Sequence, residues 1–158
     1  MSSSGRTRVL PNGDRERAEP QLLPGAVEEL TRWCGPQLLT IPRYVQRPTD
    51  LAGVTIGAGE PVTVAIVAAN RDPRVFPDPD RLDLRSTSAA AHLGYAHGPH
   101  FCLGAPLARV QTAVALGALL TRFPDLALSD DAALAGVAAR RVPDPGTWRL
   151  AALPVTVG

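Results

Sequence analysis

Apolar side chains recur every three or four residues in two stretches of the chain, the spacing that places them on one face of an α-helix. The first stretch predicts a helix around Leu23–Trp33, which Gly35 and Pro36 end. The second predicts an amphipathic helix that begins near Leu103 and runs to about Phe123. The positions that mark the two apolar faces are Leu23, Ala26, Val27, Leu30 and Cys34 in the first, and Leu107, Val110, Val114, Leu119 and Leu120 in the second.

Other short runs are rich in valine, isoleucine and aromatic residues, as strands are. Gly57 and Gly59 indicate a turn, Gly57–Glu60, between two of these runs. The predicted extended segments are Leu39–Val45, Val54–Ile56, Pro61–Val67, Trp148–Ala151 and Pro154–Val157.

Three segments carry neither pattern. Asn70–Arg85 is dense in Asp, Arg and Pro, and proline is excluded from helix interiors, so this segment is predicted to be ordered coil. Leu93–Gly104 is predicted to be a glycine-containing loop, and residues 1–13 a disordered leader. The fold class expected for residues 14–158 is α+β, mainly helical.

Composition narrows the class of protein. The 158 residues have a formal net charge of only +1, which predicts neither a nucleic acid nor an anionic membrane as partner. Two cysteines are too few to hold together a secreted disulfide scaffold. No apolar run reaches the roughly 18 residues that a membrane span needs, and no signal peptide is visible. We therefore expect a soluble, cytoplasmic protein.

The loop before the second helix carries the candidate chemistry. Cys102 lies just ahead of the helix, and Pro106 falls within the opening turn, where a missing N–H costs little. The unpaired N–H groups and the dipole of such a turn favour a thiolate, which is a ligand for iron. Gly98 and Gly104 allow the backbone to approach a flat cofactor, and Tyr95 is expected to pack beside the sulfur.

Two other interpretations of these residue types exist. Cysteine often behaves as a small buried hydrophobe, and this interpretation is the favoured one for Cys34, on the apolar face of the first helix. A zinc site would need nitrogen and sulfur ligands, but the spacing of the candidates does not match paired-ligand zinc motifs. Those candidates are His92, His97, His100 and Cys102.

The spacing Tyr95-x-x-Gly98-x-x-x-Cys102-x-Gly104 resembles the cysteine-loop signature of the cytochrome P-450 family, and residues 100–109 resemble its soluble bacterial members. The resemblance implies that Cys102 is the axial ligand of haem b (iron protoporphyrin IX). It also implies that Tyr95, Gly98 and Gly104 lie against the cofactor.

Further segments resemble the same family. Glu29-x-x-Arg32 matches its Glu-x-x-Arg motif, and the helical i, i+3 spacing brings these two side chains together. By resemblance, Arg81 completes a structural ion-pair network with this pair. Arg43 and His100 match the partners of the two haem propionates.

The resemblance implies a haem-thiolate monooxygenase that inserts one atom of O2 into a small hydrophobic organic substrate. Its electrons would come from a ferredoxin-like or flavoprotein donor. The similarity begins near Asp14 and covers only the C-terminal, haem-binding part of the family's fold. The truncated chain alone is therefore not expected to be competent, and no catalytic residue is assigned. The alternative is a non-catalytic remnant, a haem-binding or interaction module.

The sequence also departs from the family's pattern at a few positions. Ala96 replaces a common glycine, and Tyr95 stands where phenylalanine is usual. Pro99 and Leu82 are likewise unusual at their positions. None of these changes removes the proposed iron ligand.

Overall fold

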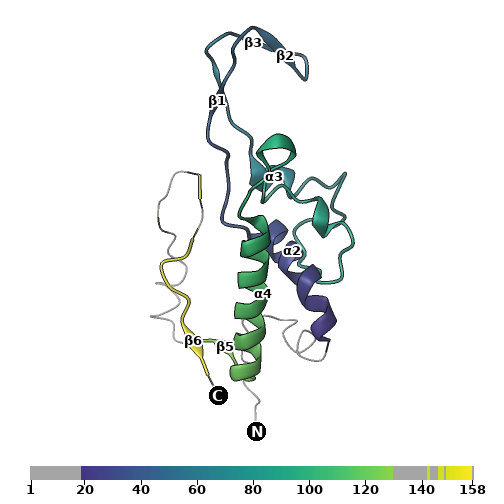
Figure 1. Ribbon diagram of the computed structural model, residues 1–158, viewed down its shortest axis with the longest axis vertical. Helices are drawn as coiled ribbons and strands as arrows, with labels where there is room; N and C mark the ends of the chain where they lie inside the picture. Colours follow the sequence, from purple (N-terminus) through teal and green to yellow (C-terminus); the bar gives the residue numbers. More distant parts are fainter. Residues whose placement is uncertain (1–18, 130–141, 143–145, 148, 158) are drawn as a thin grey trace.

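Helices and three small sheets make up the computed structural model, which describes residues 19–129, 142, 146–147 and 149–157. A 3-10 turn, Pro20–Leu22, leads into helix α2, Leu23–Cys34, and the 18-residue helix α4 spans Ala105–Arg122. The first predicted helix is confirmed, and the second is confirmed with a start two residues later than expected. The two helices pack against each other, as Figure 1 shows.

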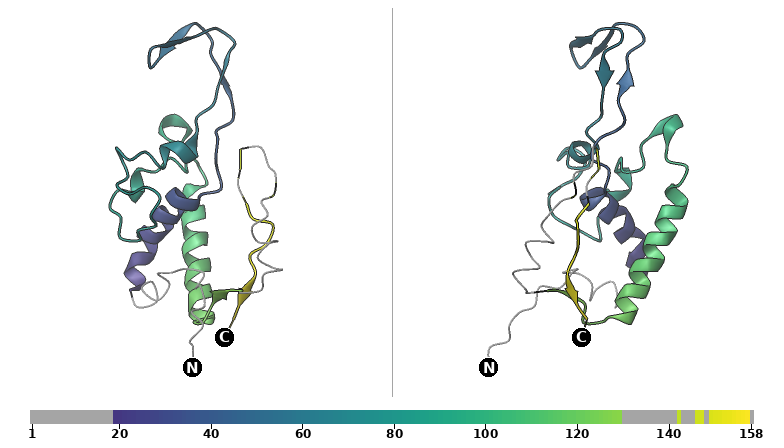
Figure 2. Two further views of the ribbon diagram at one scale, coloured as in Figure 1. Left: turned by 180° about the vertical axis from the view of Figure 1, so that it is seen from behind. Right: turned by 90° about the vertical axis from the view of Figure 1, so that its left-hand side faces the viewer.

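Each sheet is a single antiparallel pair of strands. The pairs are β1 (Arg43–Tyr44) with β4 (Pro61–Val62), β2 (Thr49–Leu51) with β3 (Val54–Ile56), and β5 (Ala127–Leu128) with β6 (Val155–Thr156). Ala52 and Gly53 join β2 to β3 with φ angles of 50° and 82°, which are typical of a two-residue type I′ hairpin turn. The first two pairs form an arm that projects away from the helices (Figures 1 and 2).

The prediction of a strand over Pro61–Val67 is wrong at its C-terminal end, from Ile66 on. The β1–β4 ladder ends at Val62, Ala65 forms one further antiparallel bridge with Leu39, and a short helix, α3, spans Ile66–Ala69. The N–H of Asn70 donates to the carbonyl of Ile66 over 2.9 Å, which closes this helical turn, while the N–H of Val67 still donates to the Leu38 carbonyl over 3.2 Å. A short apolar run fits a strand and a buried helical turn equally well, and the alanines that follow favour the helix.

The predictions for the remaining segments agree more closely with the structure. The turn at Gly57–Glu60 is confirmed by a 3.2 Å hydrogen bond from the Glu60 N–H to the Gly57 carbonyl. Asn70–Arg85 is coil, as predicted, and a 3-10 turn, Ala89–Ala91, follows it. Pro154–Val157 contains β6, whereas Arg149–Ala151 contains no named strand. Trp148 and the predicted leader lie outside the described residues.

The core of the described residues is small and contains four buried polar side chains. Its apolar members are Ala26, Val27, Ile66, Phe76, Leu84, Ala89, Ala105, Leu120, Leu126 and Ala127. The buried polar ones are Glu29, Arg32, Asn70 and His92. Because a buried polar group must be hydrogen-bonded to be tolerated, these four side chains show where the fold is most constrained.

Arg32 and Glu29 form a buried ion pair on α2, as the i, i+3 spacing predicts. The Arg32 Nε donates to Glu29 Oε2 over 2.7 Å and its second terminal nitrogen to Oε1 over 2.8 Å. The remaining donors reach three main-chain carbonyls, those of Asn70 (3.0 Å), Pro79 (2.8 Å) and Arg81 (3.1 Å). All five N–H groups of the guanidinium therefore have an acceptor.

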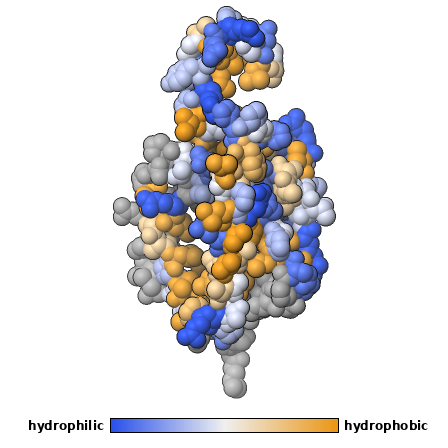
Figure 3. All heavy atoms as spheres, in the orientation of Figure 1, coloured by the Kyte–Doolittle hydropathy of each residue, from blue (hydrophilic) through white to orange (hydrophobic). Residues whose placement is uncertain are grey.

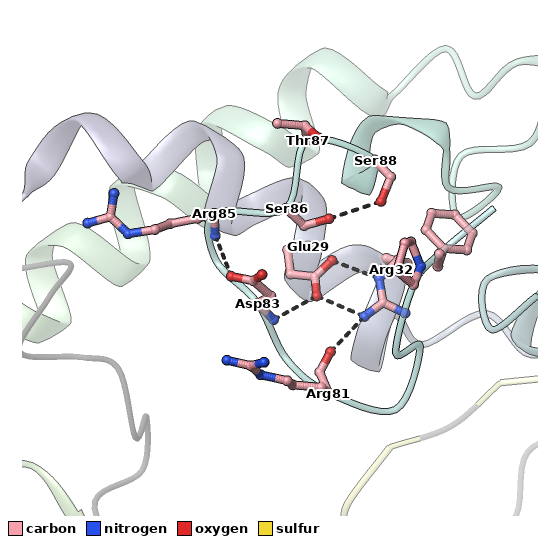
Figure 4. Close-up of a pocket in the computed structure, with 10 residues that line it drawn as sticks. Glu29, Arg32, Arg81, Asp83, Arg85, Ser86, Thr87 and Ser88 are labelled. Atoms are coloured by element: carbon pink, nitrogen blue, oxygen red, sulfur yellow. Dashed lines mark hydrogen bonds and ion pairs between the residues drawn. The ribbon is translucent and has the colours of Figure 1, made fainter. Parts of the chain in front are cut away.

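Arg81 joins this network in a way that the sequence does not indicate. Its main-chain carbonyl accepts from Arg32, while its own side chain is exposed. Figure 4 shows the Arg81 guanidinium pointing away from Glu29, beside a pocket of about 250 Å³. The expectation that Arg81 contributes a charge to the ion pair is therefore corrected. The course of the main chain directs the Arg81 carbonyl toward Arg32. This carbonyl accepts the last N–H of the Arg32 guanidinium without adding a second charge.

No helix in the described part of the chain combines the length and the apolarity that a bilayer crossing requires. Most of the α4 face that was expected to be packed is instead exposed. The exposed positions are Leu107, Val110, Val114 and Leu119, whereas Leu120 is buried. Figure 3 shows apolar residues gathered over this helix.

Removing either member of the buried pair should destabilise the chain strongly. Glu29→Ala and Arg32→Ala should each lower the free energy of unfolding by about 3–5 kcal/mol, because the partner is left buried and unpaired. The double variant should lose much less than the sum of the two. Urea unfolding monitored by circular dichroism measures all three values.

The exposed pair of Arg85 and Glu19, at 2.6 Å, provides the matched control. Glu19→Ala should cost only about 0–1 kcal/mol. Small and additive losses for Glu29→Ala and Arg32→Ala, similar to the control, would contradict the network.

Candidate functional site

The cysteine loop is closed by hydrogen bonds between its two sides. The N–H of Cys102 donates to the Tyr95 carbonyl over 2.8 Å, and the N–H of Phe101 donates to the Gly98 carbonyl over 2.9 Å. The second bond closes a 3-10 turn, Gly98–His100. The Cys102 carbonyl then accepts from the Ala105 N–H over 3.1 Å, which leads directly into α4. The loop thus has a defined main-chain shape that holds Cys102 just before the helix.

The side chain of Cys102 is exposed and unbonded to another cysteine. Its neighbours Phe101 and Leu103 are exposed as well, Leu103 by 98%. The interpretation of Cys102 as a buried hydrophobe therefore does not hold. Cys34 is also exposed, which corrects the expectation that it lies on the packed face of α2.

Gly98 and Gly104 have different roles in this loop. Gly98 has a φ of +70°, a left-handed conformation that side chains disfavour, so glycine is favoured there. Gly104 has an ordinary φ of −81° and caps α4. A Cβ on Gly104 would lie 3.8 Å from the Cys102 sulfur. A Cβ there would make an ordinary van der Waals contact with the sulfur, and the backbone of Gly104 does not require glycine.

Tyr95 lies among other rings and a cation. Its ring centroid is 5.4 Å from that of His92 and 6.5 Å from that of Phe101. The guanidinium carbon of Arg109 lies 4.7 Å from the Tyr95 centroid. The Cys102 side chain stays exposed beside this group of rings. The carbonyl of Tyr95 accepts from the Cys102 N–H.

Arg43 and His100, the predicted propionate partners, are both exposed. Arg43 lies on β1, and His100 is the last residue of the 3-10 turn in the cysteine loop. Within the residues that the structure describes, neither side chain forms a hydrogen bond or an ion pair. Both side chains are therefore available to an external anionic group.

Glu28 binds both Arg109 and His92, a role that the sequence did not predict. Arg109 donates to it from Nε over 2.5 Å and from a terminal nitrogen over 2.9 Å, which ties α4 to α2. His92 Nε2 lies 3.1 Å from the same carboxylate. The hydrogen bonds from Arg109 hold the pKa of Glu28 below its ordinary value of 4.5. The only sequence signal was a second carboxylate beside Glu29 and an arginine closing the cysteine motif.

His92 is neutral in this arrangement. Burial lowers its pKa below the ordinary 6.5, although Glu28 acts in the opposite direction. The N–H of Gly94 donates to His92 Nδ1 over 2.9 Å, so that nitrogen carries no proton and Nε2 is the donor to Glu28. The contact between His92 and Glu28 is therefore a hydrogen bond rather than an ion pair.

These contacts also test the zinc interpretation. Both ring nitrogens of His92 are engaged by protein groups. Among the described residues, no group of three or more His, Cys, Asp or Glu side chains is placed to hold a metal ion. His97, His100 and Cys102 lie within that described part, so the structure does not support a zinc site.

The donor set does fit a haem iron. Haem needs one axial protein ligand, apolar surface and counter-charges for its propionates. Cys102 supplies a single exposed thiol, with exposed apolar side chains at Phe101 and Leu103 on either side of it. Arg43 and His100 remain uncommitted. The sequence model of the cytochrome P-450 family matches residues 7–131, which is most of the chain.

This chain belongs to the cytochrome P-450 family. It is 54% identical over 110 residues to a mycinamicin IV hydroxylase/epoxidase of Micromonospora griseorubida, covering 69% of this chain and 28% of that protein. It is 50% identical over 112 residues to the cytochrome P-450 monooxygenase PikC of Streptomyces venezuelae, covering 71% and 27%. The chain thus spans less than a third of the length of these relatives.

Solved structures of the family share the fold. The tirandamycin C-bound P-450 monooxygenase TamI superimposes with a TM-score of 0.85 at 37% identity, covering 92% of this chain and 35% of that one. The predicted fold class, the haem-binding part of the cytochrome P-450 fold with helices and small sheets, is confirmed. Membership of the family implies haem iron as the cofactor.

Ala96 has a φ of +64°, so its replacement of the family's common glycine leaves strain in the loop. Ala96→Gly should raise the free energy of unfolding by about 0.5–1 kcal/mol, because a left-handed alanine costs more than the extra freedom of glycine in the unfolded chain. The melting temperature should rise accordingly.

Ala118→Gly, at an exposed position of α4, is the matched control. It should lower stability by about 0.5–1 kcal/mol, because glycine is unfavourable inside a helix. A loss of stability in Ala96→Gly similar to that in Ala118→Gly would show that Ala96 is not strained.

Proposed function

We propose that this chain is the haem-binding part of a haem-thiolate monooxygenase and that Cys102 is the axial ligand of the iron. The observation that carries the proposal is the exposed Cys102 thiol at the end of a loop fixed by the 2.8 Å bond to Tyr95. A ligand that is exposed and held by its main chain needs little reorganisation when it binds metal.

The start of α4 suits a negatively charged sulfur. The Cys102 sulfur lies beside Gly104, the residue that caps the helix, and Pro106 occupies the first turn. The positive end of a helix dipole interacts favourably with an anion, which supports thiolate ligation. The exposed side chains of Phe101 and Leu103 would bury apolar area against the porphyrin.

Haem b is the form of the cofactor that we propose. Its two propionates carry negative charge, and Arg43 and His100 are exposed side chains that can meet them. An arginine guanidinium binds a carboxylate with two parallel hydrogen bonds, which makes Arg43 the stronger of the two contacts. When bound, haem supplies the oxygen-activating redox chemistry, while this chain ligates the iron and orients the porphyrin.

The reaction that we propose places one oxygen atom of O2 in a small hydrophobic organic substrate, with a ferredoxin-like or flavoprotein electron donor. The relatives named hydroxylase, epoxidase and monooxygenase support this reaction class. Because the chain spans less than a third of those relatives, activity is best tested on the chain within a full-length family member.

Replacing Cys102 tests the proposed ligand. In the haem-loaded protein, the red-shifted absorption band of a ferrous carbon monoxide complex with thiolate should disappear in Cys102→His, because imidazole replaces sulfur on the iron. Cys34→Ser should leave the band unchanged and serves as the matched control, since Cys34 is the other cysteine and is also exposed. Persistence of the band in Cys102→His would overturn the assignment.

A further inference from the structure

Glu28, Arg109 and Tyr95 connect helix α2 to the peptide that holds Cys102. Arg109 lies on α4, seven residues after Cys102, and its side chain returns over the loop. The guanidinium is held at its edge by both oxygens of Glu28 and lies over the Tyr95 ring, 4.7 Å from the centroid. It also lies 6.0 Å from the centroid of Phe101, the residue before Cys102.

These contacts restrain both sides of the loop at once. On the outgoing side, Tyr95 carries the carbonyl that accepts from the Cys102 N–H over 2.8 Å. On the returning side, Phe101 meets the Tyr95 ring edge-on, with 6.5 Å between the centroids. A planar cation that contacts both rings limits their movement and so limits the movement of the carbonyl.

The carboxylate of Glu28 restrains the start of the loop as well. It receives the His92 Nε2 hydrogen, and His92 Nδ1 receives the Gly94 N–H. The loop is pressed closely against α2 at this point, because a Cβ on Gly94 would lie 2.7 Å from Cγ2 of Thr31. Glu28 of α2 is therefore connected to the cysteine loop in two ways, through Arg109 and through His92.

We propose that Arg109 is a positioning residue for Cys102. Arg109 fixes the position of Tyr95, whose carbonyl accepts the Cys102 N–H, and Glu28 in turn fixes the position of the Arg109 guanidinium. The inference rests on the proposed function in one respect, that the placement of this sulfur matters because it binds iron. The competing explanation is that Arg109 only ties α4 to α2 and that its loss affects the two helices and the loop equally.

Amide hydrogen exchange in the full chain without haem separates the two explanations. The Cys102 N–H reports the bond to Tyr95, and the Ala108 N–H, bonded to the Gly104 carbonyl over 2.9 Å, reports α4. Arg109→Lys keeps the charge but loses the planar fork, and Glu28→Gln keeps the shape but loses the charge. Each should speed exchange at Cys102 relative to Ala108 by about tenfold or more, because the loop opens locally.

Arg71→Lys is the matched control. Arg71 is exposed to the same degree as Arg109, 33% against 35%, and it also bridges two segments, from Asp80 to the Trp33 carbonyl. Among the described residues its hydrogen bonds and ion pair do not involve the cysteine loop, so the ratio of the two exchange rates should stay within about twofold of its original value. Parallel acceleration of Cys102 and Ala108 in Arg109→Lys and Glu28→Gln would overturn the proposal.

A second readout links the loop to the iron. In the haem-loaded protein, Arg109→Lys should reduce the fraction of the ferrous carbon monoxide complex that shows the thiolate band, and Arg71→Lys should not. Equal fractions in the two variants would contradict the positioning role. Absence of the band from the unaltered protein would instead overturn the proposed function, while the exchange result without haem would still decide the role of Arg109 in the loop.

Discussion

The buried guanidinium of Arg32 has five N–H groups, and each of them must find an acceptor away from water. Glu29 accepts two of these bonds, and main-chain carbonyls of the coil at Asn70, Pro79 and Arg81 accept the rest. The hydrogen bonds within this proline-rich segment are local turns, such as that from the Phe76 N–H to the Asp72 carbonyl, and they do not fix its position relative to α2. The requirement to satisfy one cation on α2 therefore gives that coil a defined path.

The same constraint reaches the cysteine loop through Asn70. Its carbonyl accepts from Arg32, and its side-chain oxygen accepts from the Leu93 N–H over 2.7 Å, where the loop begins. Glu28, next to Glu29, meets the loop from a second direction. Successive residues of a helix point about 100° apart, so two adjacent carboxylates can serve two different neighbours. Helix α2 thus holds the coil through the Glu29–Arg32 pair and the cysteine loop through Glu28.

Features that depend on nearby residues could be predicted from the sequence. The helical spacing of Glu29 and Arg32 determines their pairing, and Gly98 occupies a backbone conformation that favours glycine. The course of the loop before α4 follows from such local signals and from the family resemblance.

Features that depend on the assembled fold could not be predicted in this way. Glu28 and Arg109 are 81 residues apart, and no local pattern pairs them. Arg81 takes part in the network through its main-chain carbonyl. Every residue has such a carbonyl, so the identity of the side chain does not predict this hydrogen bond. The exposed face of α4 is apolar in sequence, and periodicity shows which side chains share a face but not what packs against it.

The central claim is that the exposed Cys102 thiol, held by its loop, is the atom that binds iron. X-ray absorption spectroscopy at the iron edge measures the bonded atoms directly, without relying on an optical band. The account predicts one sulfur atom bonded to iron in the haem-loaded protein, present in Cys34→Ser and absent in Cys102→Ser. Iron surrounded only by nitrogen and oxygen in the unaltered protein would contradict it.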